Sequence, residues 1–369
     1  VVNIHGLVLG GLGRKMSKSL DNGIDPIEVI EKYGADTLRF SLTTGVTPGN
    51  DVRFNWEKVE NTRNFANKIW NASRFVLMNL DGYRAMEPAE QELTLADRWI
   101  ISELNTRLAA VSAHLEKYDL GEAARELYEF IWDEFCDWYI ELTKPRLFNR
   151  DSEQARLVAQ NVLVRVLMDI LRALHPFMPF ITEEIYQHLP GHSDTIMLDA
   201  WPAGERQWPE AVDDMRIIMQ MIRSIRNIRA EFTVSPGAPL EAVVVVGDEA
   251  LMAMLKDNSN LITEMANLSQ VRIAAGLEHK PQQAAASLMA EAEIYVPLGG
   301  AIDVDKEIQR LQKEMRNAEA EMEKADAKLK NPQFVAKAPQ EVIVKEQGKL
   351  QEASAKREGI IRRLQILKG

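Results

Sequence analysis

The sequence is poor in the residues that form disulfides, zinc sites and membrane helices. Its one cysteine, Cys136, excludes an internal disulfide framework, and we interpret it as a small buried apolar residue. The six histidines are scattered and, together with that cysteine, form no recognisable zinc spacing. No apolar run approaches the ~20 residues of a membrane helix, and no stretch reads as a cleavable signal. We therefore expect a cytoplasmic protein that has no metal site and no membrane partner.

Acidic residues outnumber basic residues, but the excess is unevenly distributed. The 369 residues carry a formal net charge of -11 at pH 7. Residues 303–369 hold 15 Lys and Arg against 12 Asp and Glu, whereas residues 1–302 hold 29 against 43. This distribution indicates that any contact with RNA uses local basic stripes. With 46% hydrophobic residues, a chain of this length predicts two or three domains.

Two lysines and two serines lie together on a short segment near the start of the chain. The segment Lys15–Ser19 reads Lys-Met-Ser-Lys-Ser; it follows a strand-like run over residues 1–9 and precedes a helix-start signal, Asp25-Pro26. Lysine ammonium groups are movable point charges that neutralise a triphosphate as its charge shifts toward a leaving pyrophosphate, and serines add hydroxyl donors. The pattern indicates a phosphate-binding loop, with a solvated basic loop as the alternative.

In this context the segment resembles the signature loop of class I aminoacyl-tRNA synthetases. By position, the resemblance implies that Lys15 and Lys18 are catalytic, Lys18 being the better candidate for stabilising the transition state. It implies that ATP, which carries its own Mg²⁺, binds the whole segment: Lys15, Met16, Ser17, Lys18 and Ser19. Asp21 stands where a glycine commonly precedes Asn22, and its acidic side chain lowers the local positive potential.

Apolar residues at a period of 3.6 dominate the middle of the chain. Two short helices are expected over 26–33 and 35–43, with a turn and short strand over 49–54. Further helices are expected over 56–80, 95–117, 121–144, 152–174, 181–189 and 211–232. Four strings resemble, in family order, the anticodon-binding bundle of the valine, isoleucine and leucine synthetases: residues 63–75, 135–139, 174–184 and 225–231.

Basic side chains of this bundle are candidates for tRNA contact. Arg63, Lys68 and Arg74 lie outside the apolar side of the helix expected over 56–80. Arg223, Arg226 and Arg229 form a stripe on the helix expected over 211–232. A solvated face crossed by salt bridges is the alternative interpretation of that stripe.

The rest of the chain predicts a small module followed by a coiled coil. Strands over 240–246, 270–275 and 291–297 and a helix over 249–265 indicate an α+β module without a catalytic constellation. From Val304 to Leu329 apolar residues alternate steps of four and three, Asn331-Pro332 ends that helix, and Pro339 begins a second. The two helices should fold back as an antiparallel hairpin, with an oligomerisation zipper as the alternative. Its candidates for tRNA contact are Lys313, Arg316, Lys349 and Arg362.

A terminal coiled-coil hairpin resembles the valine branch of the subgroup, whereas the isoleucine branch typically ends in a cysteine-rich zinc module. The expected fold is mainly α. It comprises the end of a class I nucleotide-binding fold with a connector (1–54), an anticodon-binding bundle (55–235), the α+β module (236–302) and a tRNA-binding arm (303–369).

The resemblance implies the C-terminal part of an enzyme that activates valine with ATP and transfers it to tRNA(Val). Its implied partners are tRNA(Val), ATP and valine, and we expect a monomer. We expect the valine pocket and editing domain to lie outside this chain, and the chain alone to be inactive. The alternatives are a stand-alone tRNA-binding module, an isoleucyl-tRNA synthetase-like fragment and a helical scaffold.

Overall fold

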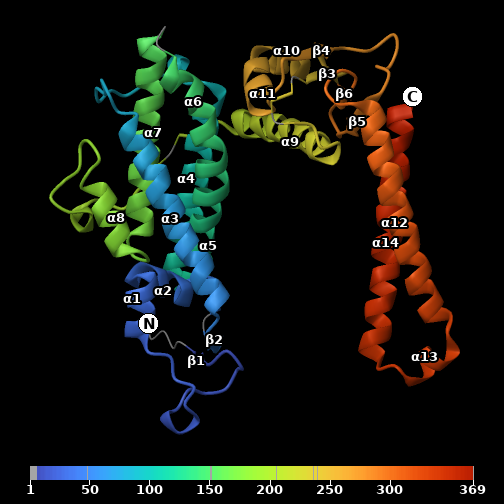
Figure 1. Ribbon diagram of the computed structural model, residues 1–369. Coiled ribbons are helices and arrows are strands. Elements are labelled where there is room, and N and C mark those ends of the chain that lie inside the picture. The colour runs from blue at the N-terminus through green and yellow to red at the C-terminus, as the bar shows by residue number, and fades with distance from the viewer. Residues whose placement is uncertain are drawn as a thin grey trace. The chain divides into compact units, whose positions relative to one another are not determined.

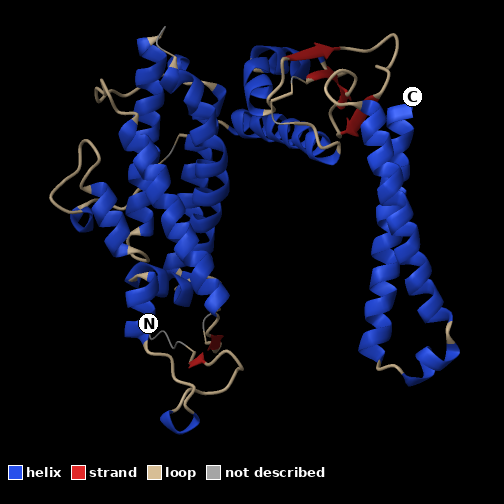
Figure 2. Cartoon of the chain, viewed as in Figure 1, coloured by secondary structure: helices blue, strands red, loops and turns tan. Residues whose placement is uncertain are grey.

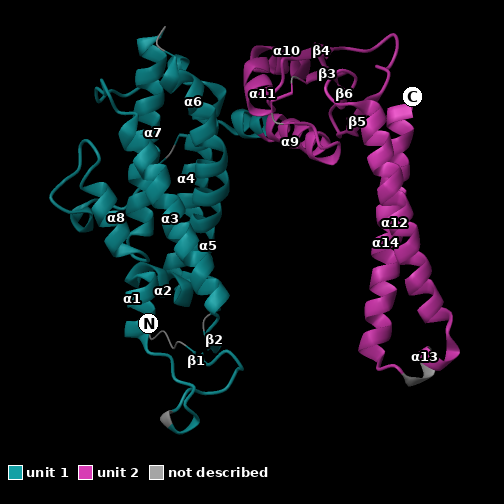
Figure 3. Ribbon diagram, viewed as in Figure 1, with its two compact units in different colours: residues 1–215 teal, residues 216–369 magenta. Residues whose placement is uncertain are grey.

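The computed structural model describes residues 6–47, 49–149, 152–204, 206–235, 237–238 and 240–368. It divides into two compact units, residues 1–215 and 216–369 (Figure 3). Helices make up most of both units, and the strands are short (Figure 2). None of the described helices is long and apolar enough to cross a membrane. The predicted predominance of helix is confirmed.

The first unit begins with a two-stranded parallel pairing of β1 (Val8–Leu9) with β2 (Val52–Arg53). Between these strands lie α1 (Pro26–Tyr33) and α2 (Ala35–Thr43), whose predicted bounds are confirmed. Asp25 caps α1 by accepting a hydrogen bond from the Ile27 amide at 2.8 Å. Gly34 separates the two helices at φ 92°, a conformation that favours glycine. Residues 1–5 of the predicted strand lie outside the described residues.

Helices form in each of the segments where the bundle helices are predicted (Figure 1), although most of the sixth, α9 (Pro209–Glu231), belongs to the second unit. The bundle helices of the first unit are α3 (Trp56–Met78), α4 (Leu95–Glu116), α5 (Leu120–Glu129), α6 (Ile140–Phe148), α7 (Glu153–Leu174) and α8 (Pro179–Tyr186). Phe65, Ile69 and Val76 of α3 are at most 1% exposed, so the predicted apolar side of this helix faces the core. Thr94 caps α4 in a capping box with Asp97.

A π-helical segment (Phe130–Tyr139) joins α5 to α6, so the helix predicted over 121–144 is continuous but not uniformly α. Most of its aromatic stripe is core, since Phe130, Phe135, Trp138 and Tyr139 are buried. Such segments are uncommon within helices and often occur at functional sites.

The second unit contains a mixed sheet of strand order β4-β3-β6-β5. β3 (Glu241–Val245) runs parallel to β4 (Gln270–Ala274) and antiparallel to β6 (Glu293–Pro297), which pairs with β5 (Ala284–Leu288). The crossover from β3 to β4 contains α10 (Glu249–Asp257) and α11 (Ser259–Met265). Three predicted strands are confirmed, and the predicted helix over 249–265 breaks at Asn258. β5 is not predicted from the sequence, because an alanine-rich segment favours strand only weakly and β5 depends on its pairing with β6.

The long helices α12 (Val304–Lys330) and α14 (Gln340–Lys368) form the predicted antiparallel hairpin, and α13 (Pro332–Lys337) lies in their connection (Figure 1). Leu311, Ala318 and Ala325 of α12 and Ala353 and Ile360 of α14 are buried, so the apolar seam is satisfied within one chain. At its base, α14 contacts β5, and the Gln283 side chain donates a hydrogen bond to the Leu367 carbonyl at 3.2 Å.

Candidate functional site

The lysine loop, residues 10–22, starts directly after β1 and is folded by its own backbone. The Gly10 amide donates to the Arg14 carbonyl at 2.9 Å, and the Gly13 amide donates to the Gly10 carbonyl at 2.7 Å. Gly13 has φ 73°, and an added Cβ would lie 3.0 Å from the Arg53 guanidinium. Glycine therefore permits this turn beside β2.

Asn22 holds the part of the loop that carries the lysines. Its Oδ1 accepts a hydrogen bond from the Ser17 amide at 2.9 Å, and its Nδ2 donates to the Lys15 carbonyl at 3.2 Å. The Ser17 and Ser19 hydroxyls lie 3.1 Å apart. This role of Asn22 is not predicted from the lysine motif, although an amide side chain can both donate to and accept from a nearby backbone.

The two residues that begin the motif face different surroundings. Lys15 is exposed, whereas Met16 is half-buried and packs against the apolar cluster of Val29, Tyr33 and Leu38. The lysine can thus meet an anion while the methionine anchors the loop on α1 and α2. The Lys18 side chain is outside what the structure describes. Asp21 has φ 47°, a left-handed conformation that aspartate tolerates better than most residues.

The three basic residues predicted on α3 are placed differently. Arg63 and Arg74 are exposed, and the Arg63 guanidinium lies 5.6 Å from the Tyr33 ring centre. Lys68 instead packs on the π-helical segment: its Nζ lies 2.6 Å from the Asp137 carboxylate and 3.7 Å from the Trp132 ring centre. Arg63 and Arg74 therefore remain accessible to an RNA backbone, while Lys68 is engaged within the bundle.

The arginines predicted on α9 (Pro209–Glu231) also separate. Arg223 is exposed. The Arg226 side chain donates to the Met265 carbonyl at 2.9 Å. Arg229 is only 8% exposed, and its guanidinium donates to the carbonyls of Asn267 and Ser235 at 3.0 and 2.9 Å. Arg226 and Arg229 thus attach α9 to the α+β module, a contact between distant segments that helical spacing could not predict.

The hairpin presents its predicted basic residues to solvent: Lys313, Arg316, Lys349 and Arg362 are exposed. Lys349 and Lys328 converge on the Glu346 carboxylate at 2.6 and 3.2 Å. They line a groove of about 490 Å³ between α12 and α14 that Lys324 and Lys356 also line.

Comparison with protein families matches three segments in order. Residues 1–55 match the tRNA synthetases class I (I, L, M and V), residues 97–244 match the anticodon-binding domain of tRNA ligase, and residues 303–368 match the valyl tRNA synthetase tRNA binding arm.

Three curated relatives are each called valine–tRNA ligase. The chain is 52% identical to the protein of Carboxydothermus hydrogenoformans, over 99% of this chain and 42% of that one. It is 46% identical to the protein of Symbiobacterium thermophilum, over 100% and 43% of the two chains. It is 44% identical to the protein of Bacillus subtilis, over 100% of this chain and 42% of that one. The chain therefore spans about two fifths of the length of these relatives.

Proposed function

Because this chain belongs to the valine–tRNA ligase family, we propose that it supplies the lysine loop and the tRNA-binding surfaces for the ATP-dependent attachment of valine to tRNA(Val). We propose valine as the amino acid because the hairpin matches the valyl tRNA synthetase tRNA binding arm. We further propose that the protein works as a monomer, since the hairpin buries its own seam. We also propose that it works in the cytoplasm, as expected of an enzyme family that acts on tRNA.

In the proposed activation step, the valine carboxylate attacks the α-phosphorus of ATP, and pyrophosphate leaves with the electrons of the broken bond. Lys15 and Lys18 neutralise the negative charge that grows on the leaving group. Two observations support this role: Met16 packs on the helical connector, and Asn22 holds the backbone at Lys15 and Ser17. A loop fixed before the reaction needs little reorganisation in the transition state.

We propose that the bundle and the hairpin bind tRNA through cations that remain accessible. In the bundle, exposure supports Arg63 and Arg74, while Lys68 makes contacts within the protein. On α9, Arg223 and Arg226 are both exposed and stay candidates, whereas Arg229 is buried against carbonyls of the second unit. In the hairpin, exposure to solvent supports four residues: Lys313, Arg316, Lys349 and Arg362. Cations spaced along two long helices suit phosphates spaced along an RNA backbone.

The experiment that tests this proposal is a titration of the 369-residue chain with tRNA(Val) and with a tRNA of different anticodon, at one fixed salt concentration. We expect tRNA(Val) to bind more tightly. Equal affinity for both tRNAs would contradict anticodon reading by the bundle, and no affinity for either would contradict the proposed function.

A further inference from the structure

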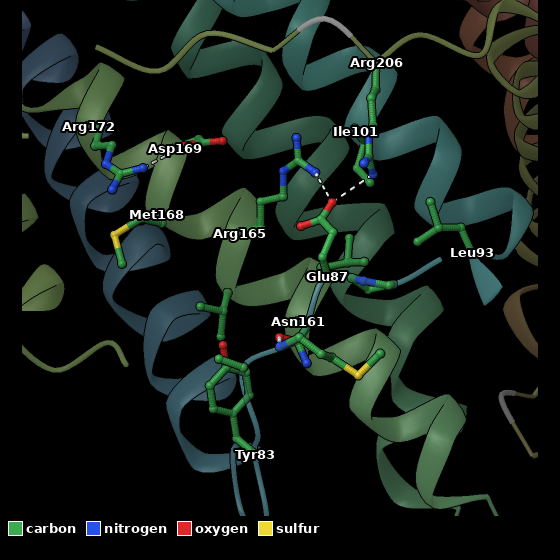
Figure 4. Close-up of a pocket in the computed structure, with 15 residues that line it drawn as sticks. Tyr83, Glu87, Leu93, Ile101, Asn161, Arg165, Met168, Asp169, Arg172 and Arg206 are labelled. Atoms are coloured by element: carbon green, nitrogen blue, oxygen red, sulfur yellow. Dashed lines mark hydrogen bonds and ion pairs between the residues drawn. The ribbon is translucent and has the colours of Figure 1, made fainter. Parts of the chain in front are cut away.

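We propose that the bundle contains a second ligand site, for a small amphipathic anion that joins an apolar body to a phosphate or carboxylate group. The site is a cavity of about 440 Å³ between the loop that follows α3, the N-terminal part of α4 and the middle of α7 (Figure 4). Its volume lies in the range of small-molecule pockets. It shares no lining residue with the lysine loop or with the hairpin groove.

The inner wall of this cavity is apolar. Leu93, Ile101 and Met168 come from three different elements and line it together, and Ile101 is only 2% exposed. Tyr83 lies at one end with its ring along the wall (Figure 4). Burial raises the pKa of the Tyr83 hydroxyl above its ordinary value, so this group stays neutral and offers a hydrogen bond without a charge. These side chains suit a ring or a branched aliphatic body.

Two guanidinium groups that line the cavity converge on one carboxylate. Glu87 Oε1 lies 2.8 Å from Arg206 Nη1 and 3.5 Å from Arg165 Nη1 (Figure 4). Arg165 projects from α7 and Arg206 from the segment before α9, so the two cations are brought together by the fold. The third arginine, Arg172, already contacts two carboxylates, Asp169 and Asp199.

The Glu87 carboxylate lies where the anionic group of the proposed ligand would bind. The side chains of Glu87, Arg206 and Arg165 are 62, 47 and 34% exposed. Ion pairs this exposed contribute little, so a ligand anion can replace Glu87 at small cost. The backbone beside Glu87 is fixed, because Asn161 accepts from the Met86 amide at 2.9 Å and donates to the Arg84 carbonyl at 3.0 Å. Exchange therefore requires movement of the Glu87 side chain alone.

The combination favours a small ligand over an RNA backbone. Phosphate contacts to RNA come from cations spread along a surface, whereas here Arg165 and Arg206 converge at one cavity that is partly lined by apolar side chains. A ligand that filled the cavity would place its anion at Arg165 and Arg206 and its apolar body against Ile101 and Met168.

The test uses the full chain with labelled methyl groups of Ile and Met, observed by NMR during titration. The probes are phenyl phosphate and phenylacetate, with inorganic phosphate and benzyl alcohol as partial probes. We expect both complete probes to shift the Ile101 and Met168 methyls with affinity roughly tenfold or more above either partial probe. Equal affinity for benzyl alcohol would overturn the anion site. An anticodon stem-loop RNA that shifts these methyls when the complete probes do not would overturn the small-ligand proposal.

Variants of the carboxylate and of the two arginines test their opposite effects on binding. Glu87→Gln should tighten binding of both complete probes several-fold, because the competing carboxylate is removed while its size is kept. Joint Arg165→Ala and Arg206→Ala changes should weaken it by roughly tenfold or more. Arg84→Ala is the matched control, since Arg84 lies on the same loop, pairs with Glu153 and does not line the cavity. Weaker binding by Glu87→Gln, or an equal loss in the Arg84 variant, would show the proposal to be wrong.

Discussion

The carboxylate of Asp36 in α2 accepts a hydrogen bond from the backbone amide of Ile181 in α8, at 2.7 Å. It also accepts from the Phe180 amide at 3.2 Å, so it caps the first turn of α8 from a helix far away in sequence. Three residues later, Arg39 donates to the carbonyls of Pro176 and Phe177 at 3.0 and 3.3 Å. The helices that carry the lysine loop are thereby joined to the bundle on both sides of one turn.

Asp36→Ala should destabilise the first unit by about 1–3 kcal/mol, because it leaves two amides of α8 without their acceptor in a partly buried setting. Asp36→Asn keeps one oxygen acceptor and should lose less. The measurement is denaturant unfolding of the full chain, followed by circular dichroism. Equal unfolding midpoints for Asp36→Ala and the unmodified chain would contradict the contact.

The stability of the bundle should fall in acid through Asp97. Burial raises the pKa of this carboxyl, but the Arg146 guanidinium, 2.7 Å from each oxygen, and the Tyr139 hydroxyl bring the pKa below its ordinary value. Because the folded pKa is depressed, the stabilisation is complete above the unfolded pKa of about 3.9 and is lost as pH falls through the folded pKa.

Asp97→Asn should therefore cost about 3–5 kcal/mol near neutral pH, because it leaves the Arg146 charge without its partner. The cost should shrink below about pH 4, where the unmodified chain also begins to lose this pair. Urea unfolding of both chains across the pH range measures the difference. If the difference in unfolding free energy between the two chains stays constant down to about pH 2, groups other than Asp97 cause the loss of stability in acid.

Asn22→Ala should release the lysine loop. Without the side chain, the Ser17 amide and the Lys15 carbonyl lose their partners, and exchange of the Ser17 amide hydrogen should accelerate by about tenfold or more. Asn22→Asp keeps an acceptor for the Ser17 amide and should give an intermediate rate. Exchange as slow as in the unmodified chain would mean that another group holds the loop.

Sequence signals predicted the elements whose ends are set locally. The Asp25-Pro26 start of α1, Gly34 between α1 and α2 and the capping box at Thr94 all act within a few residues. These local signals do not predict contacts between segments that are far apart in sequence. The burial of Arg229 depends on carbonyls of Asn267 and Ser235, and the cap of α8 comes from Asp36. The π-helical segment and β5 likewise depend on packing and pairing, which hydrophobic periodicity does not encode.

Joint Lys313→Ala and Arg316→Ala changes should weaken tRNA(Val) binding and lower its salt dependence. If each residue neutralises one phosphate, the slope of log affinity against log salt should fall by roughly 0.9 per residue. Lys306→Ala is the control, since Lys306 lies at the base of the hairpin beside Asp303 at 2.9 Å. If the double variant keeps the affinity and the slope of the unmodified chain, these two residues are exposed to solvent but do not contact tRNA.

The most direct measurement is made in a chimera, in which this chain replaces the segment that it matches in the Carboxydothermus hydrogenoformans relative. The account predicts valine-dependent ATP–pyrophosphate exchange and formation of valyl-tRNA by the chimera. In it, Lys18→Ala should lower exchange by a factor on the order of a hundred, with tRNA affinity nearly unchanged. A folded chimera that binds tRNA(Val) but exchanges no pyrophosphate, or whose exchange does not respond to Lys18→Ala, would contradict the proposed role of the lysine loop.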